Sequence, residues 1–173
     1  MNKSLYIWKA AYLVAAAAVF LFDQASKAWA IRKLRFGGDY PVIKGYLNFA
    51  YAENPGVAFS QFNDYGEYGR WGLSGIAIIA AIFVTYFFWK VPKSQDRLLG
   101  ALALLLAGIV GNVTDRIRLG FVIDFIDVQF GSWHYPTFNI ADAAICTGAI
   151  LLLIDMFYSK KEEVPSLNAD KKK

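Results

Sequence analysis

The chain has 173 residues and a formal net charge of +4 at pH 7, and 57% of its residues are hydrophobic. Together with a mean hydropathy of +0.35, this apolar content exceeds what the core of a soluble domain of this size needs, so the composition excludes an ordinary soluble protein and indicates a membrane protein. The positive charge does not indicate nucleic-acid binding. Five lysines lie in the C-terminal tail after an apolar segment, where they suit anionic lipid headgroups.

Four apolar segments approach the length of about 20 residues that a transmembrane helix requires. They cover residues 10–31, 71–89, 98–113 and 138–158. The first also resembles a cleavable signal peptide, because lysines precede it and its Ala28-Trp29-Ala30 triplet is similar to a cleavage site. Three further spans follow, so we expect the first to be retained. The predicted fold class is an all-α membrane protein with four transmembrane helices.

The basic residues favour both termini in the cytoplasm. Ten lysines and arginines flank the spans on the side of the termini, whereas the seven on the other side are spread over two longer loops. The outward loops are then residues 32–70 and 114–137, and residues 1–159 form a single membrane domain. Residues 160–173 are a charged cytoplasmic tail that we expect to be disordered.

The outward loops predict structure of their own. Residues 47–51 and 122–129 alternate between apolar and small or polar side chains, which predicts strands that pair as a small extramembrane sheet. Aromatic rings recur at every third position from residue 62 to residue 71, which predicts a short helix lying on the membrane surface.

Two groups of polar residues interrupt the spans, where a charge at the bilayer centre costs about 3 kcal/mol on insertion scales. Asp23 and Lys27 are four residues apart, so we interpret them as a neutralising pair on one helix face near the outer interface. Gly108, Asn112 and Asp115 can share a face of the third span, where the glycine permits close helix packing. Spacing alone favours a scaffold role for both groups.

Asp124 and Asp142 form a different pattern. Asp124 lies among apolar residues of the second outward loop, and Asp142 lies near the start of the last span, so both should lie near the outer membrane face. Two close carboxylates in a poorly solvated site tend to share a proton. The ionised one can take a proton from water as it attacks a peptide carbonyl, which the protonated one polarises. A proton relay or a structural role for one carboxylate fits the bare pattern equally well.

Other catalytic apparatus is scarce in the sequence. The single histidine, His134, and the single cysteine, Cys146, cannot form a familiar zinc site, and no phosphate-binding glycine motif occurs. Cys146 lies within the fourth span and is interpreted as a small packing residue. We therefore expect no metal and no cofactor.

Five ordered blocks resemble the motifs of the lipoprotein signal peptidase family, also called signal peptidase II. They are Asp23-Gln24-Ala25-Ser26-Lys27, Asn54-Pro55-Gly56-Val57-Ala58-Phe59, Gly111-Asn112-Val113-Thr114-Asp115-Arg116, Val122-Ile123-Asp124-Phe125 and Phe138-Asn139-Ile140-Ala141-Asp142. The resemblance implies a bacterial inner-membrane aspartyl protease whose four helices carry a small β-cradle and a surface helix that helps to gate the site. Asp124 and Asp142 would be its catalytic dyad.

The resemblance also implies supporting residues, a substrate and an inhibitor. The residues that would shape or support the site are Asp23, Lys27, Asn54, Gly56, Gly108, Asn112, Asp115, Arg116, Asn139 and Ala141. The family cleaves diacylglyceryl-modified prolipoproteins just before the lipidated cysteine and is inhibited by the cyclic peptide globomycin. The implied partners are lipid-modified prolipoproteins and membrane lipids, and we expect a monomer with its active site near the outer face.

Two other functions fit parts of the pattern. A small proton-coupled transporter would use the same aspartates as relay groups, although such proteins are expected to carry carboxylates through both halves of the membrane. A non-catalytic assembly factor would tolerate asparagine at both dyad positions.

Overall fold

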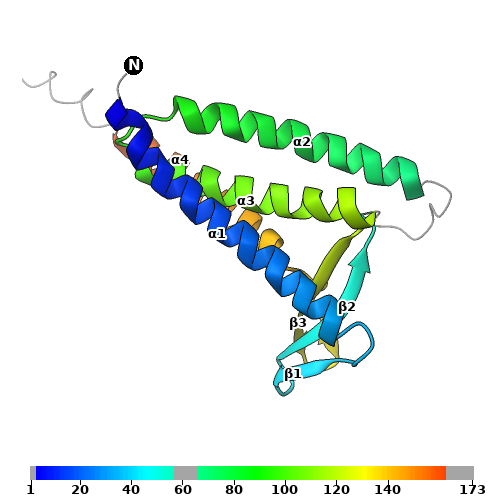
Figure 1. The fold of residues 1–173 in the computed structure, drawn as a ribbon. Helices are drawn as coiled ribbons and strands as arrows, with labels where there is room; N and C mark the ends of the chain where they lie inside the picture. The colour runs from blue at the N-terminus through cyan, green and yellow to red at the C-terminus, as the bar shows by residue number, and fades with distance from the viewer. Residues whose placement is uncertain (1–2, 57–65, 163–173) are drawn as a thin grey trace, which may run out of the picture.

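The structure, a computed structural model, describes residues 3–56 and 66–162. This part of the chain forms four long helices and a small antiparallel sheet (Figure 1). The helices are α1 (Lys3–Lys33), α2 (Gly66–Lys90), α3 (Asp96–Leu119) and α4 (Ile140–Glu162), and the strands are β1 (Tyr40–Ile43), β2 (Leu47–Asn54), β3 (Val122–Phe130) and β4 (Trp133–His134). Each helix contains a stretch long and apolar enough to cross a membrane, so the predicted fold class is confirmed.

Helix α3 is the central element, and α1, α2 and α4 all pack against it (Figure 1). Of its most apolar stretch 56% is buried, against at most 17% in the other three helices. Glycines at the contact allow α4 to approach α3 closely. A Cβ atom at Gly148 would lie 2.8 Å from the carbonyl oxygen of Ala101, and one at Gly108 would overlap the carbonyl oxygen of Ala141. The two backbones therefore approach as small residues allow in membrane helix pairs.

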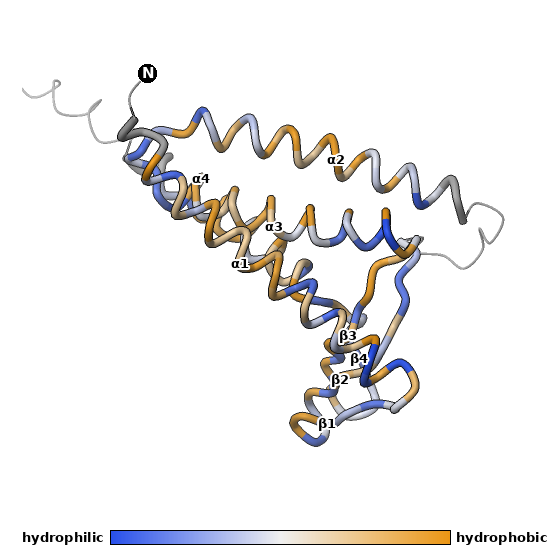
Figure 2. Tube along the Cα trace, in the orientation of Figure 1, coloured by the Kyte–Doolittle hydropathy of each residue, from blue (hydrophilic) through white to orange (hydrophobic). Residues whose placement is uncertain are grey.

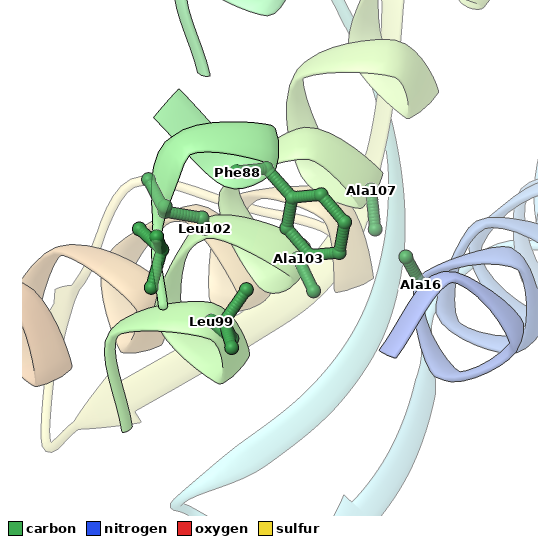
Figure 3. Packing of buried hydrophobic residues seen from close by; sticks show 7 residues of the cluster. Ala16, Phe88, Leu99, Leu102, Ala103 and Ala107 are labelled. Atoms are coloured by element: carbon green, nitrogen blue, oxygen red, sulfur yellow. The ribbon is translucent and has the colours of Figure 1, made fainter. Parts of the chain in front are cut away.

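An apolar core fills the end of the bundle remote from the sheet (Figure 3). Its buried members are Ala16, Phe88, Val91, Leu99, Leu102, Ala103 and Ala107. Lys9 lies beside this core, and its ammonium donates hydrogen bonds to the carbonyl oxygens of Phe88 at 2.8 Å and Trp89 at 2.9 Å. Both carbonyl groups belong to the last turn of α2, where a cation is stabilising.

The C-terminal end of α3 extends further than hydropathy predicts. The predicted span stops at residue 113, but the helix continues to Leu119, and Gly120 ends it with a φ of 92°. The Gly120 N–H donates to the Arg116 carbonyl, which also accepts a hydrogen bond from Arg70 at 2.7 Å. Asp115 and Arg116 are therefore helical residues, not members of an outward loop. Figure 2 shows hydrophilic positions on this last part of α3, next to the sheet.

The sheet has the strand order β1-β2-β3-β4, with every neighbouring pair antiparallel. The predicted pairing of residues 47–51 with 122–129 is confirmed, with Phe49 opposite Ile126. A shift in register follows Phe49, and Ala52 lies opposite Asp124. The apolar face of β3 packs on the end of α1, in a cluster that includes Ala30 and Phe125. This packing attaches the sheet to the helix bundle.

Two predicted segments lie partly or wholly outside the described residues. The surface helix predicted over residues 62–71 is described only from residue 66, where α2 already begins, so Tyr68 and Trp71 belong to α2. The charged tail predicted for residues 160–173 lies outside the described residues except for the end of α4.

Candidate active site

Asp124 lies on β3 and points away from the apolar cluster. Its neighbours Ile123 and Phe125 pack into that cluster, so the alternation of the strand turns the carboxylate to the other face. The residue is only 2% exposed. Oδ2 accepts a hydrogen bond from Asn54 Nδ2 at 2.9 Å, and Oδ1 accepts one from Asn139 Nδ2 at 2.7 Å. Two neutral amide donors therefore hold the carboxylate.

Asp142 is the third residue of α4, and Asn139 precedes that helix. The Asn139 Oδ1 atom accepts a hydrogen bond from the Asp142 N–H at 2.8 Å, while the Asn139 N–H donates to Asp142 Oδ2 at 3.3 Å. This reciprocal arrangement is a capping box. The other carboxylate oxygen, Oδ1, accepts a hydrogen bond from Asn112 Nδ2 of α3 at 2.7 Å. The start of α4 thus fixes the orientation of Asp142.

Asn139 joins the two carboxylates. Its position beside β3 is set by Phe138, which forms an antiparallel bridge with Ile126. From there the amide nitrogen of the Asn139 side chain binds Asp124, and the amide oxygen binds the backbone of Asp142. Asn139 is fully buried. One rigidly held side chain therefore sets the position of Asp124 relative to Asp142.

The environment of Asp124 favours its protonated form. Burial raises the pKa of this carboxyl to about 6, and the nearby charge of Asp142 acts in the same direction. Hydrogen bonds from Asn54 and Asn139 and the charge of Lys27 lower the pKa and limit the rise. A carboxyl with this pKa takes up and releases a proton close to neutral pH, as a general acid–base group must.

Lys27 is the centre of a second buried polar group, here called the Lys27 cluster, which comprises Asp23, Gln24, Lys27 and Asp115. The ammonium lies 2.9 Å from Asp23 Oδ2 and 2.8 Å from Asp115 Oδ2. It also donates to Asn112 Oδ1 at 3.1 Å, so all three of its N–H groups can be used. Gln24 Nε2 lies within 3.1 Å of both carboxylates. The predicted Asp23–Lys27 pair is confirmed, as part of a larger cluster between α1 and α3.

The Lys27 cluster is connected to the start of α4 by two routes. Asn112 accepts a hydrogen bond from Lys27 and donates one to Asp142. Asp23 Oδ1 accepts a hydrogen bond from the Ala141 N–H at 2.8 Å. A carboxylate is favourable here because the first N–H groups of a helix carry partial positive charge. The cluster therefore positions the helix turn that carries Asp142.

Gly56 and Arg116 lie close to the Asp124 partner Asn54. The Gly56 N–H donates to Asn54 Oδ1 at 2.8 Å, and its φ of +80° favours glycine. A Cβ atom at Gly56 would lie 3.2 Å from Arg116 Nη2. The Arg116 Nε atom is buried and has no hydrogen-bond partner among the described residues. It is therefore available as a donor to a bound carbonyl group.

Two residues of the site were not among those predicted from the sequence. A Cβ atom at Gly111 would lie 2.8 Å from Asp23 Oδ2 and 3.1 Å from the Ala141 Cβ, so only glycine lets α1, α3 and α4 meet there. Gln24 bridges two carboxylates of the Lys27 cluster. Both signals were available in the sequence, because Gly111 follows Gly108 by three residues and Gln24 follows Asp23 directly.

A groove of about 490 Å³ opens beside Asp142. It is lined by the segment before α4, from Tyr135 to Phe138, and by Asp142, Ala143 and Cys146 of the helix. Cys146 is exposed, so its interpretation as a packing residue is wrong. The small residues that pack against α3 are instead Ala141 and Gly148, which leave Cys146 on another face of α4.

The structure brings the predicted site residues into one connected region. The dyad, its amide partners Asn54, Asn112 and Asn139, and the charged residues of the Lys27 cluster are joined by hydrogen bonds, while Gly56, Gly108, Arg116 and Ala141 border them. Within residues 3–56 and 66–162, no three His, Cys, Asp or Glu side chains are grouped as metal ligands would be. The catalytic roles themselves remain predictions.

Comparisons with known proteins agree with this arrangement. The chain matches the family described as signal peptidase (SPase) II over residues 15–158. It is 44% identical to the lipoprotein signal peptidase of Polynucleobacter necessarius, with 87% of this chain and 90% of that protein aligned. It is 40% identical to the lipoprotein signal peptidase of Syntrophus aciditrophicus, with 94% and 99% aligned.

A solved structure of a bacterial membrane enzyme, obtained by the in meso method, superposes with a TM-score of 0.78 at 32% identity and covers 89% of this chain and 92% of its own. The sequence match, the shared fold and the coverage of nearly the whole chain agree. The chain therefore belongs to the signal peptidase II family of lipoprotein signal peptidases.

Proposed function

We propose that this protein is an aspartyl endopeptidase that removes the signal peptide from diacylglyceryl-modified prolipoproteins, cleaving before the lipidated cysteine. The observation that carries the proposal is the pair of carboxylates joined by Asn139, one of them with a pKa raised to about 6. The names of the relatives support the substrate class. Residues 1–159 would act as one membrane peptidase domain.

Hydrolysis by this pair requires one ionised and one protonated carboxyl group. The ionised group takes a proton from water while the water oxygen attacks the carbonyl carbon of the scissile bond. The protonated group donates to the carbonyl oxygen, where negative charge develops. The proton taken from water then passes to the leaving amine.

Arg116 supports substrate binding in this proposal. Its buried Nε donor has no hydrogen-bond partner among the described residues, and its charge interacts with both Asp124 and Asp142. A substrate carbonyl bound to Nε would be positioned near the dyad, and it would replace a missing hydrogen bond rather than disrupt an existing one. We expect globomycin-type cyclic peptides, which present several carbonyl groups, to compete for this position.

The proposed orientation places the dyad near the outer membrane face. Four spanning helices return the chain to its starting side, and the sheet lies at the end of the bundle opposite to the N-terminus (Figure 1). With the termini in the cytoplasm, as the basic residues favour, the sheet and the dyad face outward. We also propose that the protein acts as a monomer.

The test is a gel-shift cleavage assay with purified enzyme and a diacylglyceryl-modified prolipoprotein, with an unlipidated precursor as a second substrate. Asp124→Asn and Asp142→Asn should each lower kcat by about 10³-fold or more. Asp127→Asn is the matched control, because it changes a carboxylate of the same strand that does not touch the dyad. Thermal unfolding checks that each variant is folded.

Either of two results would contradict the proposal. Normal cleavage by both dyad variants would remove the catalytic assignment. A wild-type enzyme that cuts neither substrate would remove the peptidase function and favour a transport or assembly role.

A further inference from the structure

A row of aromatic rings leads from the tip of the sheet to the groove beside Asp142. The ring centroids of Phe130 and Trp133 are 6.0 Å apart, those of Trp133 and Tyr135 are 6.2 Å apart, and those of Tyr135 and Phe138 are 6.0 Å apart. The first three rings are more than half exposed. Exposed Trp and Tyr rings of membrane proteins lie at the level of the lipid headgroups. The row therefore places the mouth of the groove at that depth.

The lining of the groove changes from polar to apolar along α4. Thr137 and Asp142 contribute oxygen atoms near the start of the helix, while Cys146 lies one helical turn deeper in the span. Phe138 and Ala143 complete its apolar wall. A ligand that fits this lining has polar atoms at the headgroup level and a hydrocarbon chain below them.

We infer that this groove holds an acyl chain of the substrate's diacylglyceryl group. The inference rests on the proposed function, in which the lipid is attached to the side chain of the residue that follows the scissile bond. The lipid must therefore extend away from the scissile bond through a space that borders a residue of the dyad. The groove beside Asp142 contains a dyad residue in its lining, whereas the groove between α2 and α3, with Ile78 and Val110 in its wall, contains none.

The size of the groove argues against the helix of the signal peptide as its occupant. An α-helix with side chains is about 10 Å across and rises 5.4 Å per turn, so each turn fills roughly 400 Å³. A volume of about 490 Å³ holds little more than one such turn. An extended hydrocarbon chain is much thinner and can follow the groove from Asp142 past Cys146.

Cys146 allows a direct test, because it is the single cysteine of the chain and is exposed in the groove. The variant Cys146→Trp would fill the groove. Met156→Trp is the matched control, since it adds the same side chain to an exposed position of α4 outside the groove. Cleavage is measured with two prolipoproteins, one carrying two long acyl chains and one carrying two acetyl groups on the glyceryl unit.

The expected result is a change in selectivity. Cys146→Trp should lower kcat/KM for the long-chain substrate by about tenfold or more, through KM, and leave the acetyl substrate nearly unchanged. Met156→Trp should behave like the wild type with both substrates. Equal losses for the two substrates, or no loss with either, would overturn the inference while leaving the peptidase function intact. Failure of the wild type to cut either substrate would instead overturn the proposed function.

A second measurement applies if Cys146→Trp does not fold. Folded wild-type enzyme is treated with a methyl or a benzyl methanethiosulfonate, which add a small or a large group to Cys146. Only the benzyl adduct should show a lower kcat/KM for the long-chain substrate. A benzyl adduct that cleaves this substrate like the unmodified enzyme would contradict the inference. In addition, a prolipoprotein with a photoactivated diazirine in its acyl chain should label residues 135–146. Labelling of the α2–α3 groove instead would assign the acyl chain to that groove and contradict the inference.

Discussion

The Lys27 cluster and the dyad are neighbouring groups of buried carboxylates with opposite properties. In the Lys27 cluster, Asp23 and Asp115 form ion pairs with an ammonium at 2.9 and 2.8 Å. In the dyad, Asp124 and Asp142 receive hydrogen bonds from neutral amides. The carboxylates of the cluster are therefore suited to a fixed scaffold, and those of the dyad are suited to proton exchange.

The cost of removing a residue should differ accordingly. A buried ion pair that loses one partner leaves an uncompensated charge, whereas a carboxylate held by amides can be replaced by an amide of similar shape. Substitutions in the cluster should lower stability first, and substitutions in the dyad should lower activity first. The following predictions test this contrast, from the largest expected effect to the smallest.

The largest effect is expected at Lys27. Lys27→Met leaves two buried carboxylates without a cation and should lower the free energy of unfolding by about 3–5 kcal/mol. Adding Asp115→Asn to this variant removes one of the two charges and should restore part of the loss. Chemical unfolding in detergent measures both variants. Equal stability of wild type and Lys27→Met would show that the cluster is not a scaffold.

The next effect is expected at Asn139, which belongs to the dyad. Asn139→Ala removes the link between the carboxylates and should lower kcat by about 10²-fold, as small misplacements of catalytic groups do. Its hydrogen bond lowers the pKa of Asp124, so its loss should move the alkaline limb of the pH profile to higher pH. Asn48→Ala is the control, because Asn48 donates to Asp127 instead. If the pH profile of Asn139→Ala does not shift, the result would contradict the assigned role of the hydrogen bond between Asn139 and Asp124.

The pH dependence of the wild type should link activity to the protonation of Asp124. Above pH about 6, Asp124 loses the proton that the acid of the dyad needs, and kcat/KM should fall about tenfold per pH unit. The folded-state pKa lies above the ordinary value of 3.8, so the native state binds this proton more tightly than the unfolded state. The contribution of Asp124 to stability is therefore complete below pH about 4 and is lost as pH rises through about 6.

Activity and this stability term thus both decrease as pH rises through about 6, and the stability term changes mainly between pH 4 and 6. Thermal unfolding of wild type and Asp124→Asn over this range isolates the term, because the variant lacks the group. A wild-type slope that persists in the variant would assign the proton to another residue.

The smallest effect is expected on the outer sheet. Although burial acts to raise it, hydrogen bonds from His134 and Asn48 keep the pKa of Asp127 below its usual value. The His134 side chain is half exposed, so His134→Ala should cost less than about 1 kcal/mol and leave kcat unchanged. A large loss of activity in this variant would extend the catalytic region to the sheet and weaken the contrast.

Much of the fold could be predicted from the sequence, because in a bilayer the length of an apolar segment indicates a membrane-spanning helix. The four spans, the strand alternation around Asp124 and the spacing of Asp23 and Lys27 each reflect a local rule. The end of α3 does not, because Asp115 lowers the local hydropathy while its charge is satisfied by Lys27, which is distant in the sequence. A hydropathy pattern contains no information about such a partner.

The residues of the candidate site could be predicted from the sequence, but the hydrogen bonds that connect them could not. Asp124 and Asp142 stand out as carboxylates in apolar surroundings, whereas the role of Asn139 depends on the bridge between Phe138 and Ile126. The exposure of Cys146 depends on which face of α4 packs against α3. Both facts arise from the packing of distant elements, for which the single sequence gives no measure.

The distribution of the site over the chain has a consequence for biosynthesis. Asn54 comes from the end of β2, Asp124 from β3, and Asn112 from α3, while Asn139 and Asp142 come with α4, the last of the four described helices. A nascent chain that lacks α4 has one carboxylate of the dyad and no bridge between the pair. In the proposed mechanism, cleavage therefore begins only after α4 has been inserted and packed, and an activity assay also measures completed membrane assembly.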